Sequence, residues 1–163
     1  MGIVISNMRI LSNSVDHTIK IGRRLAARLK KGDIVCLTGP LGSGKTVLAK
    51  GIAGSLGIKQ GAVISPTFVL IREYKGRNIP LYHFDLYRLD SPQDILALGY
   101  EEYLYDEGIT VIEWPERLSY LMPEEYLMVK LSMPSLNRRY LQFSAQGNRY
   151  KGLLRQIYED IRN

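Results

Sequence analysis

The sequence predicts a single α/β domain, spanning residues 1–163, with a mixed, partly antiparallel central sheet flanked by helices. Two observations lead to this fold class. An apolar, β-branched run at residues 34–38 is followed by a glycine-rich loop and then by apolar residues at helical spacing, which is typical of a strand–loop–helix unit. Farther along, residues 68–74 and 79–85 read as strands joined by a short turn, and strands joined this closely pair antiparallel.

The loop from Gly39 to Thr46 fits the phosphate-binding pattern G-x-x-x-x-G-K-[ST]. Its glycines let the backbone turn tightly, so that the N–H groups point at phosphate oxygens. Lys45 is expected to reach the β- and γ-phosphates, and the Thr46 hydroxyl to bind Mg²⁺. The sequence therefore predicts a P-loop NTPase domain. The expected nucleotide-binding residues are Gly39, Leu41, Gly42, Ser43, Gly44, Lys45, Thr46 and Val47.

The remaining elements follow from the same kinds of pattern. A weak strand and a helix capped by a residue of the Ser12–Ser14 stretch precede the loop strand. Ser91 and Pro92 form a typical helix start. The further strands are expected at residues 8–11, 109–112, 126–133 and 138–145, and the helices at residues 15–31, 45–56, 93–98, 100–105 and 149–161.

The net charge of +6 is unevenly distributed. Residues 1–60 hold ten Lys or Arg and two Asp or Glu, and residues 126–163 hold seven and two. Residues 92–125 hold nine acids and one base. These segments are either ordinary solvated faces, or a basic surface near nucleotide or RNA together with an acidic surface for a basic partner.

Composition also bears on the compartment. Cys36 is the single cysteine, so no disulfide can form within the chain, and a buried core thiol is expected. No apolar run approaches the roughly 18 residues of a membrane span, and the first residues do not resemble a secretory signal. These features favour a cytoplasmic protein without membrane contact.

Two carboxylates follow predicted strands, where a P-loop nucleotidase needs acids beside Mg²⁺ and the attacking water. Glu113 ends a very apolar strand, and a metal role is favoured over that of a surface acid. Asp85 ends the strand at residues 79–85. Its alternatives to a site role are a cap or an ion pair with Arg88.

Three other side chains are candidates beside the site. The Thr67 hydroxyl can contact Mg²⁺ or the γ-phosphate, or belong to an ordinary turn. His83 shares a strand face with Asp85, so it either orients a phosphate or water or is a hydrogen-bonded structural residue. Trp114 is expected in the core, with a lid over the site as the alternative.

Three short blocks accompany the phosphate loop: Ser-Pro-Thr-Phe at residues 65–68, His-Phe-Asp-Leu-Tyr-Arg-Leu at 83–89, and Glu-Trp-Pro-Glu-Arg at 113–117. In this order and spacing they resemble the TsaE (YjeE) family of bacterial P-loop proteins, over about residues 19–131. The resemblance implies a compact P-loop fold with a mixed sheet, which binds ATP and Mg²⁺ and hydrolyses ATP weakly alone. It also implies work with the proteins TsaB and TsaD, which activate turnover, in threonylcarbamoylation of adenosine 37 in tRNA.

The resemblance also implies roles for individual residues. Lys45 and Thr46 match the phosphate and magnesium residues, and Glu113 matches the acid near Mg²⁺. Asp85 matches an acid that binds metal or positions water, and Thr67 matches a switch-like threonine. The expected catalytic set is Lys45, Thr67, Asp85 and Glu113, and the expected metal ligands are Thr46, Asp85 and Glu113. Apart from the resemblance, we expect adenine between residues 11–13 and the turn at residues 137–139.

Two other functions fit a phosphate loop. One is a P-loop kinase of a small molecule, although such enzymes usually carry an arginine-rich lid and the middle segment here is acidic. The other is a nucleotide sensor that binds without turnover. The basic segments add the expectation that tRNA lies close to the protein, either within the assembly or in direct contact with this chain.

Overall fold

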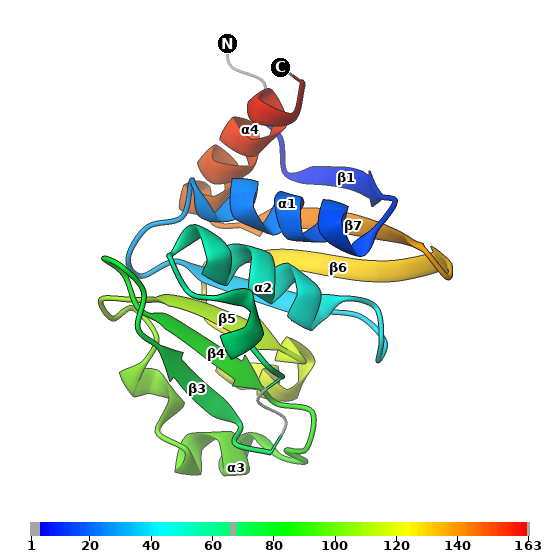
Figure 1. The fold of residues 1–163 in the computed structure, drawn as a ribbon. Coiled ribbons are helices and arrows are strands. Elements are labelled where there is room, and N and C mark those ends of the chain that lie inside the picture. The colour runs from blue at the N-terminus through cyan, green and yellow to red at the C-terminus, as the bar shows by residue number, and fades with distance from the viewer. Residues whose placement is uncertain (1–3, 66–67, 163) are drawn as a thin grey trace.

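The structure, a computed structural model, describes residues 4–65 and 68–162. Within these residues the chain forms a seven-stranded sheet in the order β1-β7-β6-β2-β5-β4-β3 (Figure 1). The strands are β1 (Asn7–Ser12), β2 (Ile34–Thr38), β3 (Ile71–Tyr74), β4 (Leu81–Asp85), β5 (Ile109–Glu113), β6 (Tyr126–Ser135) and β7 (Arg138–Gln146). The α-helices are α1 (Val15–Ala26), α2 (Lys45–Ser55), α3 (Pro92–Ala97) and α4 (Asn148–Arg162). Short 3₁₀ helices are η1 (Gln60–Ala62), η2 (Tyr100–Glu102) and η3 (Pro115–Leu121).

The sheet is mixed, as the sequence predicts. Strand β2 pairs in parallel with β5 and with β6, and β4 pairs in parallel with β5. The pairs β3–β4, β6–β7 and β1–β7 are antiparallel. The expected α/β fold with a partly antiparallel sheet is therefore confirmed, and the parallel strands β2, β4 and β5 end at one edge of the sheet.

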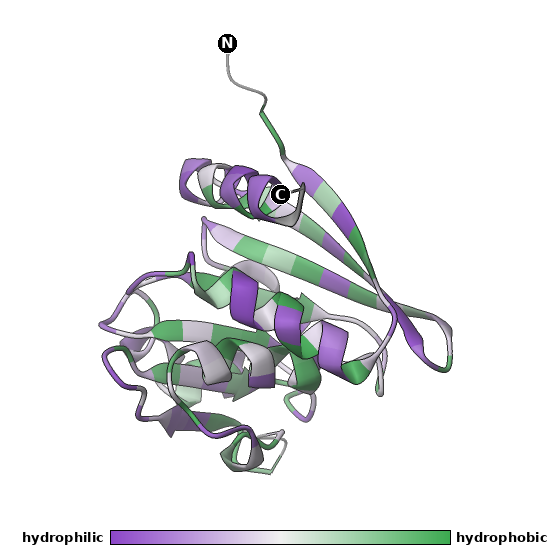
Figure 2. Cartoon of the chain, turned by 45° about the horizontal axis from the view of Figure 1, so that its top comes forward, coloured by the Kyte–Doolittle hydropathy of each residue, from purple (hydrophilic) through white to green (hydrophobic). Residues whose placement is uncertain are grey.

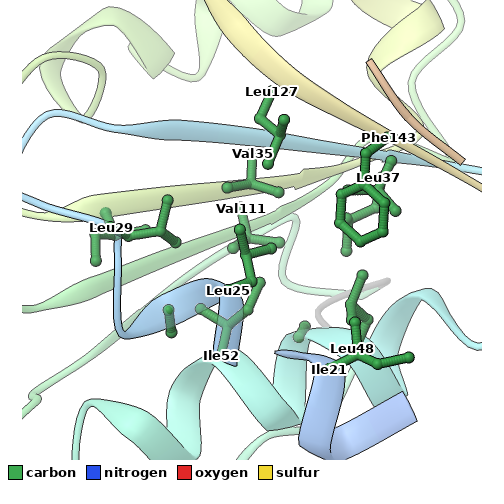
Figure 3. Packing of buried hydrophobic residues seen from close by; sticks show 14 of the residues in the cluster. Ile21, Leu25, Leu29, Val35, Leu37, Leu48, Ile52, Val111, Leu127 and Phe143 are labelled. Carbon is green, nitrogen blue, oxygen red and sulfur yellow. The ribbon is translucent and has the colours of Figure 1, made fainter. Parts of the chain in front are cut away.

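Helices α1, α2 and α4 cover one face of the sheet. Their apolar side chains form a core with those of the central strands, and Figure 3 shows residues of α1 and α2 pointing at strand residues such as Leu37 and Phe143. An ion pair between Arg28, which follows α1, and Asp160 of α4 joins the two segments, with 2.7 Å between the charged atoms. On the other face, α3, η2 and η3 form a second core over the β2, β5 and β4 part of the sheet.

The two helices next to the loop pack through glycines. A Cβ atom on Gly22 of α1 would lie 2.6 Å from the carbonyl oxygen of Leu48, and one on Gly51 of α2 would meet the carbonyl of Ile19. Only hydrogen at both positions permits this close approach. The contact fixes α2, which carries the end of the phosphate loop, against the rest of the core.

Some element ends differ from the sequence expectations. Helix α1 stops at Ala26, and not at residue 31, because the chain turns there to enter β2; the Asp33 carboxylate stabilises that turn by accepting from the Lys30 N–H at 2.8 Å. Strand β3 begins at Ile71, and not at residue 68, because Leu70 has a left-handed backbone with φ 73°. The expected helix at residues 100–105 is shortened to η2, and η3 is an addition to the expected elements.

Candidate nucleotide-binding site

The phosphate loop connects β2 to α2 through three glycines in the left-handed region. Their φ angles are 145° at Gly39, 77° at Gly42 and 102° at Gly44. A Cβ atom on Gly39 would lie 2.5 Å from the carbonyl oxygen of Leu131 in β6 and 2.8 Å from the Ser43 hydroxyl. Both the backbone conformation and the space therefore require glycine at this position.

The loop also holds a polar atom with no partner. The Ser43 hydroxyl oxygen is buried and makes no hydrogen bond to any residue that the structure describes. An unpaired buried hydroxyl is costly unless another group satisfies it. A phosphate oxygen in the loop is such a group, so this orphaned atom fits the nucleotide expected from the motif.

The side chain of Lys45 extends back over the first residues of the phosphate loop. Its Nζ atom donates to the carbonyl oxygens of Gly39 at 2.6 Å and Pro40 at 3.0 Å, and it lies 4.5 Å from the centre of the Trp114 ring. Burial lowers the pKa of this ammonium, while the carboxylates of Glu113 and its acidic neighbours act in the opposite direction. The charge is thus held, partly desolvated, where an anion would be bound.

Glu113 is the acid nearest to the loop in the sheet. Strand β5 pairs with β2 so that Glu113 lies beside Leu37, which brings its carboxylate to the start of α2. Its Oε1 atom accepts a hydrogen bond from the Thr46 hydroxyl at 2.9 Å and lies 2.9 Å from Nε2 of His83. Glu113 and His83 are both buried. A buried carboxylate held by two partners has a fixed orientation, as a metal or water-positioning group requires.

Asp85 lies next to Glu113 in register, because β4 pairs with β5. Its carboxylate accepts from the Ser65 hydroxyl at 2.8 Å and from the backbone N–H of Tyr87 at 3.0 Å. The side chain of Arg88, considered above as an ion-pair partner, lies over the Phe68 ring at 4.3 Å. Thr67, the other residue expected here, lies outside the described residues.

These groups line a pocket of about 370 Å³ beside the loop. Lys45, Thr46, Asp85 and Glu113 all contribute to it. One wall consists of Trp114 and Tyr87, whose ring centres are 4.9 Å apart. Trp114 has φ 59° and is half-buried. It packs on the second core, as expected, and it also lines the pocket, as the alternative of a lid requires.

A second pocket, of about 380 Å³, lies on the other side of the loop. It is lined by the start of α1, by Gly42, Gly44 and Val47, and by the turn between β6 and β7. Arg139 fixes this turn, since its guanidinium donates to the carbonyl of Leu136 at 3.0 Å and to that of Gly42 at 3.3 Å. The pocket lies where the sequence expectation places adenine, between residues 11–13 and 137–139.

Comparison with known proteins bears on which P-loop family this is. The family model described as "Threonylcarbamoyl adenosine biosynthesis protein TsaE" matches residues 12–141, which is most of the chain. The chain belongs to the TsaE family. The resemblance seen in the three sequence blocks is therefore confirmed.

Individual members of the TsaE family agree over most of their length. A Bacillus subtilis protein named tRNA threonylcarbamoyladenosine biosynthesis protein TsaE is 37% identical over 150 residues, covering 91% of this chain and 93% of its own. A Rickettsia conorii protein of the same name is 41% identical over 127 residues, covering 78% and 72%. The crystal structure of Bacillus subtilis YdiB superposes with a TM-score of 0.82 at 31% identity, covering 98% and 99%.

Sequence patterns locate this TsaE-family site but miss several of its parts. The motif and strand ends place Lys45, Thr46, Asp85 and Glu113, and the structure brings all four to one pocket. Ser65 and Tyr87 stand within the recognised blocks, so their position alone could have indicated them. The expected adenine position, between residues 11–13 and 137–139, includes Arg139 but not the start of α1, and the sheet order brings both of them to the loop.

None of the helices in the described residues is both long enough and apolar enough to span a membrane. Among the same residues there is also no group of three or more His, Cys, Asp or Glu side chains that could hold a metal ion. The pocket beside the loop instead combines two carboxylates, from Asp85 and Glu113, with the Thr46 hydroxyl.

Proposed function

We propose that this chain binds MgATP and hydrolyses it weakly alone, and that assembly with TsaB and TsaD stimulates hydrolysis during threonylcarbamoylation of adenosine 37 in tRNA. Family membership supports an ATP-binding P-loop protein of this pathway. One observation supports hydrolysis of ATP in addition to its binding: the buried Glu113 carboxylate is oriented by Thr46 and His83 beside the loop. We also propose that residues 1–163 act as one domain.

For ATP, the proposed placement uses both pockets. The triphosphate would lie in the loop from Gly39 to Thr46, with the Lys45 ammonium offsetting its charge and the Ser43 hydroxyl gaining a partner. Adenine would enter the pocket between α1 and the β6–β7 turn, which Gly42, Gly44 and Val47 border. This pocket is mostly apolar with a few polar groups, as a nucleobase requires.

For Mg²⁺, the donor set fits a phosphate-bound ion. The oxygens of Thr46, Asp85 and Glu113 line one pocket, and they are hard ligands of the kind this ion prefers. Protein sites for Mg²⁺ usually supply one or two carboxylates and leave the remaining positions to phosphates and water. When bound, the ion would supply neutralisation of charge on the phosphates. Asp85 and Glu113 would orient the attacking water, and Thr67 is proposed as a further contact to the γ-phosphate.

An ATPase assay on the full chain, with and without TsaB, TsaD and tRNA, tests the proposal. We expect slow Mg²⁺-dependent phosphate release alone and a large increase in the complete mixture. Lys45→Ala should weaken triphosphate binding and abolish release in both conditions, because the ammonium that offsets the phosphate charge is gone. ATP binding without turnover in every mixture would favour a sensor. ADP formation matched by a phosphorylated small molecule would favour a kinase.

A further inference from the structure

On one face of the sheet, β1, β7 and the part of β6 beyond Met128 are not covered by any helix of the described residues. On β1, β6 and β7, residues such as Ile10, Val129 and Phe143 point into the core under α1 and α4. The alternate residues point the other way, and Figure 2 shows this alternation as purple and green bands along the strand that follows the N-terminus. Helices α3, η2 and η3 lie against the β2, β5 and β4 part of that second face.

Strand register shows which side chains share this uncovered face. Arg9 of β1 pairs with Gln142 of β7, Gln142 pairs with Lys130 of β6, and Lys130 pairs with Thr38 of β2. Directly paired residues have their side chains on the same side of a sheet. Arg9, Gln142 and Lys130 therefore form a row across three strands, and all three are exposed.

The face has a cationic and polar character. Strands β1, β6 and β7 contain no Asp or Glu, and their exposed side of the sheet includes Arg9 and Lys130. Between and beside these charges lie hydroxyl and amide groups. A carboxylate borders the row at one corner, where Glu116 accepts a hydrogen bond from Thr38 at 3.3 Å.

Arg9 is held in place by an aromatic ring. Its guanidinium carbon lies 3.7 Å from the centre of the Tyr140 ring, which is a stacked arrangement. Within the part of the chain that the structure describes, neither Arg9 nor Lys130 makes a side-chain hydrogen bond or an ion pair. Among the described residues, two cations without a hydrogen-bond or ion-pair partner are thus presented to solvent, and one of them is stacked on a ring.

We propose that this surface, which we name the open face and define by Arg9, Lys130, Ser132, Tyr140, Gln142 and Ser144, binds a single-stranded segment of RNA. The unpaired cations complement phosphates, and the hydroxyl and amide groups can donate to backbone oxygens and base edges. An exposed sheet that carries an aromatic ring is an established way for proteins to hold unpaired bases. None of these six side chains lines either pocket beside the phosphate loop, so binding at the open face needs no ATP turnover.

Binding of fluorescently labelled single-stranded RNA of about a dozen nucleotides tests the proposal, measured by anisotropy on the full chain over a salt series. The test variant carries Arg9→Glu and Lys130→Glu. The control variant carries Lys20→Glu and Lys151→Glu, which make the same charge change at exposed positions of α1 and α4. An unmodified tRNA transcript is a second probe with an unpaired anticodon loop.

The wild-type chain should bind with steep salt dependence. The test variant should bind at least about tenfold more weakly and lose roughly 1.4 from the log–log salt slope, since each phosphate contact on a single strand contributes about 0.7. The control variant should stay within about twofold of the wild type, and Tyr140→Leu should reduce affinity several-fold. Hydrolysis of ATP should be unchanged in all of these variants.

Three outcomes would overturn the proposal: no binding by the wild type, binding that does not depend on salt, or equal losses in the test and control variants. If the test variant instead keeps RNA affinity and loses capture by TsaB or TsaD, the open face is a protein-docking surface and the RNA assignment is wrong. A chain that binds RNA as described but never hydrolyses ATP would refute the proposed function and leave this inference standing.

Discussion

The Nε2 atom of His83 lies 2.9 Å from Oε1 of Glu113, and the same carboxylate oxygen accepts the Thr46 hydroxyl at 2.9 Å. Three segments far apart in the sequence therefore meet at one atom: the start of α2, strand β4 and strand β5. His83 is fully buried, and its other ring nitrogen makes no hydrogen bond to any described residue. We propose that this contact gives the buried histidine a role in positioning the Glu113 carboxylate.

Replacing Glu113 by alanine should reduce hydrolysis more than ATP binding. In the proposed function this carboxylate serves the metal ion and the attacking water. Such groups act mainly in the transition state, so we expect kcat to fall about a hundredfold. Phosphate-release kinetics and calorimetric Kd values measure the two effects. Glu116→Ala is the matched control, because Glu116 is exposed and bonds Thr38. Normal hydrolysis by Glu113→Ala in the complete assembly would show the assignment to be wrong.

Removing the His83 contact should loosen Glu113 and lower kcat while leaving the Kd for ATP nearly unchanged. Loss of a buried partner of a carboxylate costs about 1–3 kcal/mol. His83→Leu, which removes the partner, should therefore lower kcat more than His83→Gln. His83→Gln keeps an N–H donor at a similar distance from the backbone and should recover part of kcat. Melting temperatures of both variants show whether the sheet is intact. Equal kcat values for the two would indicate that the histidine only fills space.

Arg139→Ala should weaken binding of ATP and ADP alike. Its guanidinium joins the β6–β7 turn to the Gly42 carbonyl, and both border the pocket proposed for adenine. Loss of one charge-assisted hydrogen bond predicts a fivefold to tenfold rise in Kd, about 1–1.5 kcal/mol. Arg138→Ala, at the exposed neighbouring position, is the control. A loss confined to ATP would instead place Arg139 at the γ-phosphate.

Replacing two helix glycines by alanine should change the free energy of unfolding in opposite directions. In α2, the methyl group of Gly51→Ala would meet the Ile19 carbonyl, so overpacking should destabilise the fold by about 1–3 kcal/mol. In α4, a methyl group on Gly152 would have no atom of the described residues within 4 Å, so Gly152→Ala should stabilise by about 0.5–1 kcal/mol. For a chain of this size each kcal/mol moves the melting temperature by roughly 2–4 °C. A stable Gly51→Ala protein would mean that α1 and α2 can separate.

The sequence is most informative where one local pattern decides the structure. The motif from Gly39 to Thr46 predicts the strand–loop–helix unit, and the short turn before residue 79 predicts the antiparallel β3–β4 pair, which the structure confirms. Strand ends likewise indicate Asp85 and Glu113. The left-handed backbone of Leu70 and Trp114 does not follow from the sequence, since neither is glycine. Their conformations depend on contacts made after the chain has folded.

Local sequence patterns do not predict contacts between residues on strands that are far apart in the sequence. That His83 meets Glu113 depends on the register of β4 with β5, and periodicity along one strand does not determine the register between two. Arg139 reaches Gly42 because β6 and β7 extend as a hairpin beside β2. Local sequence patterns do not predict the open face either, because its row of side chains comes from three strands that are not all consecutive in the sequence.

The register that places Glu113 beside both Leu37 and Asp85 has a consequence for which changes in length the chain tolerates. Successive side chains of a strand point to opposite faces, so inserting or deleting one residue within β5 would turn the carboxylate toward the side of α3. The same event in the turn between β3 and β4 leaves every paired residue where it is. Insertions and deletions accumulated over evolution should therefore fall in such turns, with the lengths of β2 and β5 held constant.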